Sequence, residues 1–242
     1  MNTRTQTALV TGANKGIGLE IARQLARAGL TVWLGSRDRE RGDAAARELS
    51  ALGDVRALSL DVTDEDSLTA AAARVEEESG VLDVLVNNAG TVSGSDGPPS
   101  TVPVDAVRNV FDVNFHGPLR VVQAFLPLVR RAPAGRVVNV SSTMGSLTTL
   151  AVPGNPLVRA PFLAYPASKT ALNSLTVWLA AELQGTPIKV NSVCPGINAT
   201  DMNSDPSGQH PSEGAEVAVR AALLPADGPT GTFFDVSGPV PW

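Results

Sequence analysis

The chain has 242 residues, of which 43% are hydrophobic and 18% are charged, and this balance excludes an intrinsically disordered protein. Its net charge is −5 and no run of Lys or Arg forms a basic patch, so we expect neither nucleic acid nor an anionic membrane surface as a partner. The single cysteine, Cys194, excludes an intramolecular disulfide and a multi-thiolate metal site, and the two histidines lie far apart in sequence, so we expect no metal.

The beginning of the chain and its hydropathy bear on location. The first residues, MNTRTQ, are polar and carry no signal-peptide pattern, and no apolar run reaches about 18 residues. A lone cysteine is typical of a protein in a reducing compartment. We therefore expect a cytoplasmic protein without a membrane span.

Short apolar runs alternate with longer amphipathic stretches along the chain. Most of the short runs are rich in Val, Ile or Leu and lack polar alternation, as in strands that are covered on both faces. The predicted strands are residues 8–10, 31–35, 55–60, 82–87, 136–141, 188–193 and 232–236. Their alternation with helical stretches predicts an α/β protein, a doubly wound parallel sheet of about seven strands with helices on both faces.

Three stretches are poor in regular structure: residues 91–103, 148–161 and 203–211. Loops of this length in a compact domain tend to be functional or mobile. None of them has the composition expected of a linker between domains. We therefore predict a single Rossmann-fold domain that spans residues 1–242.

The segment TGANKGIG, residues 11–18, follows the first predicted strand and opens an amphipathic helix. In such a position Gly12 permits a sharp turn, Gly16 lets a pyrophosphate approach the backbone, and Gly18 allows close packing of helix on strand. The unpaired N–H groups of the first helical turn favour an anion. A tight turn without a ligand would also explain glycines here, and the strand–helix context favours the phosphate site.

The glycine segment also resembles the cofactor motif of the short-chain dehydrogenase/reductases, and further motifs of that family follow in order. Residues 87–90 (NNAG), Asn114 in VNF, Ser142 at the end of NVSS, Tyr165 and Lys169 in YPASK, and PGINAT at 195–200 are all similar to family motifs. The resemblance covers nearly the whole chain. The TGANKGIG loop with its basic residue resembles in particular the carbonyl reductases of the family.

Tyr165 and Lys169 are four residues apart, so on a helix they share one face. A phenol is a weak base at neutral pH, and we expect the nearby ammonium to lower its pKa. Tyr165 then exchanges a proton with a carbonyl or alcohol oxygen, while the cofactor exchanges the hydride. The resemblance implies that Ser142 holds the same oxygen, that Lys169 also contacts the nicotinamide ribose, and that Asn114 supports a water linked to Lys169.

Two neighbours compete with Ser142 for the serine role. Ser141 is the stronger rival, and because side chains alternate along a strand, the two serines are expected on opposite faces. Thr143 is a weaker candidate. The family pattern favours Ser142.

The resemblance implies a set of cofactor-binding residues. They are Gly12, Asn14, Lys15, Gly16, Ile17, Gly18, Ser36, Arg37, Asp61, Val62, Asn88, Ala89, Gly90, Tyr165, Lys169, Pro195, Gly196, Ile197 and Thr200. In relatives an Asp at the position of Asp61 accepts a hydrogen bond from the adenine amino group. A helix cap or a turn is the alternative role for this residue.

The end of the second predicted strand bears on the choice of cofactor. NAD-specific relatives carry an acid there that binds the ribose 2′-hydroxyl, and this chain has Ser36 and Arg37 instead. A guanidinium suits a 2′-phosphate, and Lys15 adds a second positive charge. Asp38 comes one residue late and is expected to pair with Arg41. We predict NADP(H) in preference to NAD(H).

The interval between Ser142 and Tyr165 is longer than in most of the family, so residues 148–161 resemble an insertion beside the substrate cleft or the usual subunit interface. The oligomeric state, monomer or homo-oligomer, stays open. Mostly apolar segments, 143–147, 152–162 and 197–211, are expected to form the substrate wall. The function predicted is NADPH-dependent reduction of a ketone or aldehyde; the alternatives are an NAD-dependent secondary-alcohol dehydrogenase and a catalytically silent dinucleotide sensor.

Overall fold

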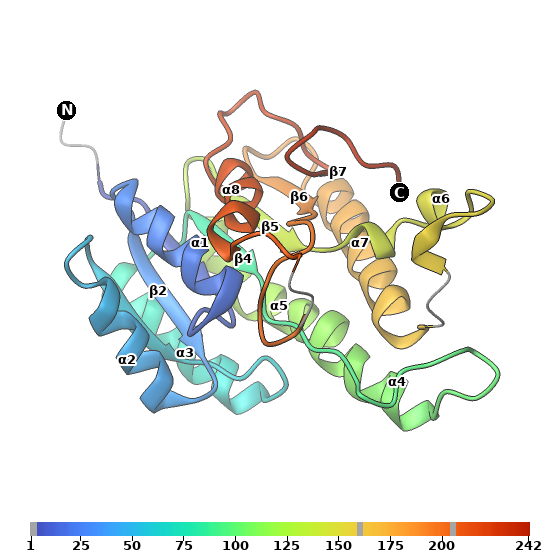
Figure 1. The fold of residues 1–242 in the computed structure, drawn as a ribbon. Coiled ribbons are helices and arrows are strands. Elements are labelled where there is room, and N and C mark those ends of the chain that lie inside the picture. The colour runs from blue at the N-terminus through green and yellow to red at the C-terminus, as the bar shows by residue number, and fades with distance from the viewer. Residues whose placement is uncertain (1–3, 159–161, 204–206) are drawn as a thin grey trace.

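The computed structural model describes residues 4–158, 162–203 and 207–242. Within these ranges seven parallel strands form one sheet in the order β3-β2-β1-β4-β5-β6-β7 (Figure 1). The strands are β1 Thr7–Val10, β2 Thr31–Ser36, β3 Val55–Ser59, β4 Val84–Asn87, β5 Arg136–Val140, β6 Lys189–Val193 and β7 Thr232–Phe234. The predicted Rossmann-type sheet is confirmed, and the predicted strands match these closely.

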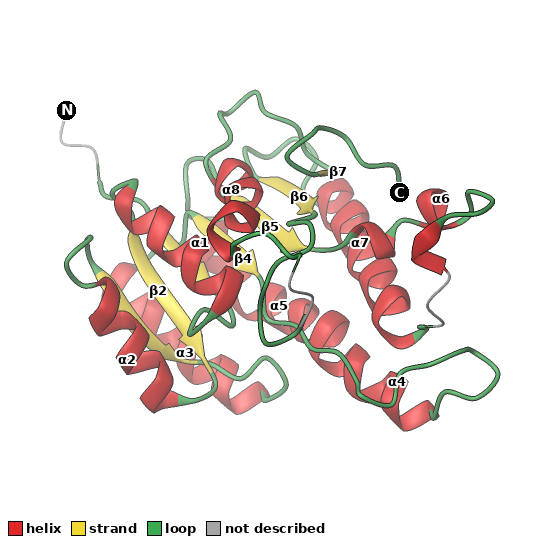
Figure 2. Ribbon diagram, in the orientation of Figure 1, coloured by secondary structure: helices red, strands yellow, loops and turns green. Residues whose placement is uncertain are grey.

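Helices cover both faces of the sheet (Figure 2). The helical segments are α1 Gly16–Arg27, α2 Arg39–Leu49, α3 Glu65–Ser79, α4 Val104–Phe111, η1 Asp112–His116, α5 Gly117–Val129, η2 Thr143–Gly145, α6 Leu147–Leu150, η3 Pro156–Val158, α7 Ala164–Glu182 and α8 Pro211–Ala222. One buried core joins the sheet to α1, α2 and α8, and a second joins it to α3, α5 and α7. No helix among the described residues is both long and apolar enough to span a membrane.

Strand alternation divides the apolar side chains between the two cores. Ala8 and Val10 of β1 pack in the first core, whereas Leu9 between them packs in the second. Because both faces are covered, nearly every residue of β1 is apolar, which is the pattern that the sequence displays. The order of strands reverses between β1 and β4, and in such sheets ligands bind at the carboxyl ends of the strands at this point.

A buried carboxylate holds the N-terminal segment to the sheet. Asp83, immediately before β4, is 2% exposed and accepts hydrogen bonds from both terminal nitrogens of Arg4, at 2.8 and 2.6 Å. It also accepts one from the backbone N–H of Thr7 at 2.7 Å. This carboxylate therefore satisfies a buried strand N–H and a guanidinium together.

Replacing Asp83 with Ala is expected to lower the free energy of unfolding by about 2–4 kcal/mol, because it leaves the buried Thr7 N–H without its partner and removes the carboxylate with which Arg4 pairs. The matched control is Asp54→Ala, which removes an exposed ion pair with Arg56 and should cost at most about 1 kcal/mol. Urea denaturation of both variants measures the difference. Equal losses would contradict the anchoring role of Asp83.

Candidate active site

A cleft of about 640 Å³ lies at the carboxyl ends of the strands around the switch point. It is lined by many of the residues predicted to hold a cofactor: Gly12, Asn14, Lys15, Gly16, Ile17, Gly18, Arg37, Asp61, Val62, Asn88, Ala89, Gly90, Tyr165, Lys169, Pro195 and Thr200. Ser36, Gly196 and Ile197 are not among its lining residues. Segments that are distant in sequence thus meet around one cavity of the size that cofactors occupy.

The glycine loop is built for close approach of the backbone. Gly12 has φ +62°, and a Cβ there would lie 2.9 Å from the Cα of Ala89. At Gly18 a Cβ would lie 2.4 Å from Asn88 Nδ2 and 2.5 Å from the Gly12 carbonyl oxygen. Helix α1 then begins at Gly16 with no side-chain cap and no acidic residue in its first turn. Its free N–H groups therefore face the cleft as an anion site.

Thr11 fixes the two loops of this site to each other. Its hydroxyl oxygen accepts hydrogen bonds from the backbone N–H groups of Asn88 and Ala89, each at 3.0 Å. The Asn88 side chain in turn donates to the carbonyls of Thr11 and Gly12. Thr11 is not among the site residues predicted from the sequence, although a hydroxyl residue at the end of β1 beside a glycine is a signal for it.

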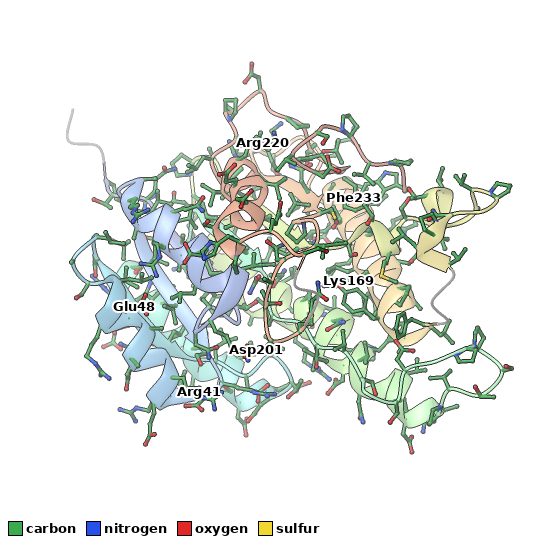
Figure 3. All side chains as sticks on the ribbon, viewed as in Figure 1. Arg41, Glu48, Lys169, Asp201, Arg220 and Phe233 are labelled. Atoms are coloured by element: carbon green, nitrogen blue, oxygen red, sulfur yellow. The ribbon has the colours of Figure 1, made fainter. Side chains whose placement is uncertain are left out.

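Tyr165 and Lys169 lie on α7, and Lys169, labelled in Figure 3, is 5% exposed. The Lys169 ammonium donates to the Val140 carbonyl at 2.9 Å and lies 5.6 Å from the centre of the Tyr165 ring. The phenol shares a hydrogen bond with Ser142. Tyr165 and Lys169 therefore both line the cleft, and Ser142 interacts with the phenol although it is not among the lining residues.

The pKa of Tyr165 is shifted in the opposite direction to the one predicted from the sequence. Burial raises the pKa of Tyr165 to about 12, although the hydrogen bond with Ser142 acts in the opposite direction. Burial also lowers the pKa of Lys169 to about 8. The prediction that Lys169 lowers the pKa of the phenol is therefore wrong, because the cost of desolvating the phenolate is the largest effect on that pKa. At neutral pH Tyr165 carries its proton and is ready to donate it.

The two candidate serines have different surroundings. The Ser142 hydroxyl accepts from the Met144 N–H at 3.2 Å and contacts the phenol. Ser141 lines the cleft, but its hydroxyl is buried and has no hydrogen-bond partner among the described residues. The contact with the phenol favours Ser142 for the catalytic role, and the choice stays a prediction.

Asn114 lies behind the cleft, in the π-helical turn η1, where the backbone departs from the α-helical pattern. The side chain is fully buried. It accepts from the N–H of Thr91 at 2.8 Å and donates to the Thr91 carbonyl and to the Ser168 hydroxyl. Asn114 thus holds Thr91, which lines the cleft. Its predicted role in binding a water remains a prediction.

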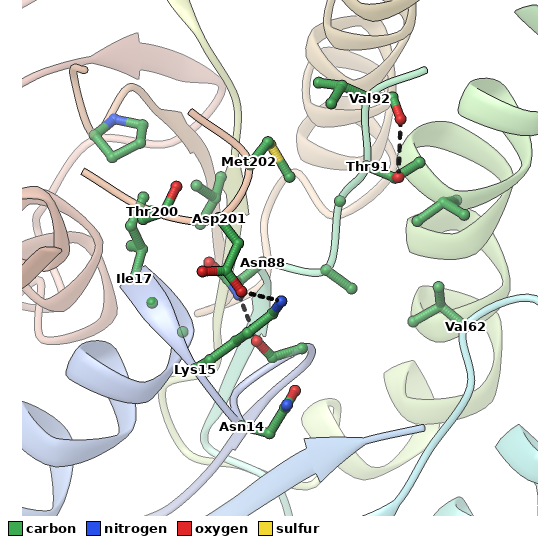
Figure 4. A pocket seen from close by; sticks show the side chains of 18 of the residues that line it. Asn14, Lys15, Ile17, Val62, Asn88, Thr91, Val92, Thr200, Asp201 and Met202 are labelled. Carbon is green, nitrogen blue, oxygen red and sulfur yellow. Dashed lines mark hydrogen bonds and ion pairs between the residues drawn. The ribbon is translucent and has the colours of Figure 1, made fainter. Parts of the chain in front are cut away.

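Two exposed cations, Lys15 and Arg37, are among the residues that line the cleft. Ser36 does not join them, because its side chain is buried and its hydroxyl donates to the Asp38 carbonyl at 2.8 Å. The predicted pairing of Asp38 with Arg41 is confirmed at 3.2 Å. Asp201, which is not among the predicted site residues, also lines the cleft, and its carboxylate pairs with Lys15 at 2.7 Å (Figure 4).

Asp61 takes the turn role that was one of the two alternatives predicted for it. One carboxylate oxygen accepts from the N–H and the hydroxyl of Thr63, which makes a turn cap. The same residue lines the cleft, so binding of an adenine amino group stays open as a prediction.

The predicted insertion begins with α6 and includes η3. Parts of it and of the third predicted loop, residues 159–161 and 204–206, lie outside the described residues. Of the predicted substrate wall, the residues that line the cleft are Ala199, Thr200, Asp201, Met202 and Pro211. Val92, from the loop of residues 91–103, lines it too. Cys194 is buried, as expected of a small core residue. Among the described residues no group of three or more His, Cys, Asp or Glu side chains is placed to hold a metal ion.

A strand–glycine loop–helix unit at a switch point, with a tyrosine and a lysine on one helix beside it, defines a dinucleotide-dependent oxidoreductase. The family model described as short chain dehydrogenase matches residues 6–210. The chain therefore belongs to the short-chain dehydrogenase family and is an NAD(P)-dependent oxidoreductase, as the motifs predict.

Comparison with individual proteins shows which members of the family the chain is similar to. The chain is 36% identical to a (+)-neomenthol dehydrogenase of Arabidopsis thaliana, over 94% of this chain and 95% of the relative. It is 35% identical to carbonyl reductase [NADPH] 1 of Mus musculus, over the full length of both. Among solved structures, an NADPH-bound carbonyl reductase from chicken fatty liver superposes with a TM-score of 0.86 at 28% identity, covering 100% of this chain and 96% of that one.

Proposed function

We propose that the protein catalyses the NADPH-dependent, reversible reduction of a ketone or aldehyde to an alcohol. The observation that carries the proposal is that Tyr165 and Lys169 line the same cleft as the glycine loop, with Ser142 interacting with the phenol. The relatives named carbonyl reductase and (+)-neomenthol dehydrogenase support the same reaction type.

The residues present fit a dinucleotide. The close approach at Gly12 and Gly18 and the uncapped start of α1 suit a pyrophosphate, which when bound brings the nicotinamide that supplies the hydride. Tyr165 donates its proton to the substrate oxygen, and Ser142 holds that oxygen within reach of the phenol. Lys169 keeps a positive charge beside the phenol and stabilises the phenolate left after donation.

We propose NADP(H) as the preferred cofactor. Lys15 and Arg37 both line the cleft, and a 2′-phosphate carries the negative charge that such cations bind. The side chains of Lys15 and Asp201 are 57% and 78% exposed, respectively. Their ion pair therefore contributes little free energy and does not prevent Lys15 from binding a phosphate.

Replacing Arg37 with Asp is expected to raise KM for NADPH by about 30-fold or more and to change KM for NADH far less, because a carboxylate repels the 2′-phosphate and accepts the 2′-hydroxyl. Steady-state kinetics with both cofactors measure this. Arg39→Asp, an exposed charge change two residues further on, is the matched control. Equal changes in both KM values would contradict the assignment.

Two lining residues with apolar side chains indicate which class of substrate fits the cleft. Val92 and Met202 line the cleft and are 45% and 44% exposed. This favours a neutral, apolar carbonyl compound. The test of the proposed function is NADPH oxidation over a panel of cyclic ketones, aldehydes and quinones, with NADH in parallel. Tight NADPH binding with no turnover of any member would instead favour a sensor.

The remaining expectations also stand as proposals. A cytoplasmic location is supported by the single buried cysteine, and the absence of a nucleic-acid partner by the net charge of −5. One domain over residues 1–242 is supported by the one sheet that holds all described strands.

A further inference from the structure

A carboxylate from another part of the chain caps the helix that carries Tyr165. Asp96 belongs to the loop of residues 91–103, between β4 and α4, which Figure 1 shows beside the N-terminal end of α7. Its Oδ1 accepts from the N–H groups of Leu163 and Ala164 at 3.0 and 2.9 Å, and its Oδ2 accepts from the N–H of Tyr165 at 3.0 Å. Helix α7 has no side-chain cap of its own, so Asp96 supplies it from nearly 70 residues away.

The carboxylate is held in one orientation. Oδ1 also accepts from its own neighbour, the Gly97 N–H, at 2.8 Å, so four backbone donors fix the two oxygens. Burial would raise the pKa of Asp96, but these backbone bonds hold it below its ordinary value. Asp96 is therefore ionised at neutral pH and makes charge-assisted bonds to the helix terminus.

The same loop is fixed at its other end. Thr91 exchanges two hydrogen bonds with the buried Asn114, at 2.8 and 2.9 Å. Thr91 itself and Val92, which lies between the two anchors, line the cleft. The loop therefore connects one wall of the cleft, through Asp96, to the backbone of Tyr165.

We propose that Asp96 is a positioning residue for the reaction: its bond to the Tyr165 N–H fixes the first turn of α7 and thereby places the phenol against the substrate oxygen. The inference rests on the proposed role of Tyr165 as the proton donor. Effective proton transfer needs the reacting atoms aligned, and a displacement of about 1 Å costs up to about 100-fold in rate.

The two oxygens allow a graded test. In Asp96→Asn the amide oxygen can still accept from Leu163, Ala164 and Gly97, but an NH₂ group then faces the N–H of Tyr165. In Asp96→Ala all four bonds are lost. Ser93→Ala is the matched control, because Ser93 lies in the same loop and its hydroxyl accepts only from the local Ser95 N–H.

The experiment measures kcat per NADPH-binding site, together with Kd for NADPH. We expect Asp96→Asn to lower kcat about 10-fold and Asp96→Ala about 100-fold, with Kd for NADPH changed by no more than about twofold, because the glycine loop is untouched. Ser93→Ala should retain the wild-type kcat. Normalisation to binding sites removes any loss that is due to unfolded protein, and if Asp96→Ala does not fold, Asp96→Asn decides alone.

A kcat for Asp96→Asn equal to that of Ser93→Ala would overturn the inference, as would parallel losses of kcat and NADPH affinity, which indicate a general structural role. These outcomes are distinct from failure of the proposed function. If Tyr165→Phe is inactive while the Asp96 variants are unaffected, only the positioning role is wrong. If Tyr165→Phe keeps full activity, the proposed mechanism itself is wrong.

Discussion

The Tyr165→Phe variant is expected to lose carbonyl reduction by about 10²–10⁴ in kcat while it binds NADPH as tightly as the wild type. The substitution removes one oxygen and leaves the ring beside Lys169 in place. The pKa of Tyr165, raised to about 12 by burial, means that the wild-type phenol is protonated at neutral pH, so the variant loses the proton donor itself. Single-turnover and steady-state rates with a substrate from the panel measure the loss.

Two serine variants make this result specific. Ser142→Ala should share much of the loss, because Ser142 hydrogen-bonds to the phenol, whereas Ser141→Ala should not. A large effect of Ser141→Ala with a small one of Ser142→Ala would reverse the assignment of the two serines. Substantial turnover by Tyr165→Phe would contradict proton donation by this residue.

Lys169→Met is expected to abolish activity and yet to stabilise the fold at pH 7 by about 1–2 kcal/mol, a rise in Tm of several degrees. Burial lowers the pKa of Lys169 to about 8 from 10.5, so the buried ammonium opposes folding by up to about 3 kcal/mol. Loss of the ammonium's bond to the Val140 carbonyl offsets part of this gain.

The dependence on pH follows from the sign of that shift. Below about pH 8 the lysine is protonated in both the folded and the unfolded state, and the cost of burying the charge is complete. Between about pH 8 and 10.5 the folded state loses its proton first, so the stability of the wild type rises with pH. Urea denaturation at pH 7 and 9.5 measures both proteins. The account would be contradicted if the difference in free energy of unfolding between variant and wild type did not shrink at pH 9.5, or if the variant were the less stable protein at pH 7.

Sequence periodicity was sufficient for the fold because both faces of the sheet are covered. Strands in that situation are continuous apolar runs, and the runs at 8–10 and 31–35 lie within β1 and β2. The spacing between Tyr165 and Lys169 was equally informative, since four residues make one turn of a helix and place both side chains on one face. These are local relations, and local relations are what a single sequence displays.

Contacts between segments that are distant in the sequence leave no local pattern from which they can be predicted. Asp96 reaches the N–H of Tyr165, and Asp201 pairs with Lys15, only because the fold brings their loops to the ends of other strands. The surroundings of Ser36 leave no such pattern either: its position in the sequence places it at the strand end, and the turn that follows directs its hydroxyl to the Asp38 carbonyl.

By itself the sequence determined the doubly wound sheet, the glycine loop at its first strand and the tyrosine–lysine pair, because each depends on neighbours within a few residues. The tertiary structure alone decided which of these groups is buried. Burial raises the pKa of Tyr165 and lowers the pKa of Lys169, whereas the four-residue spacing of the pair predicts a lowered pKa for the tyrosine. Desolvation depends on everything packed around a group, and that packing is set by contacts between residues far apart in the chain.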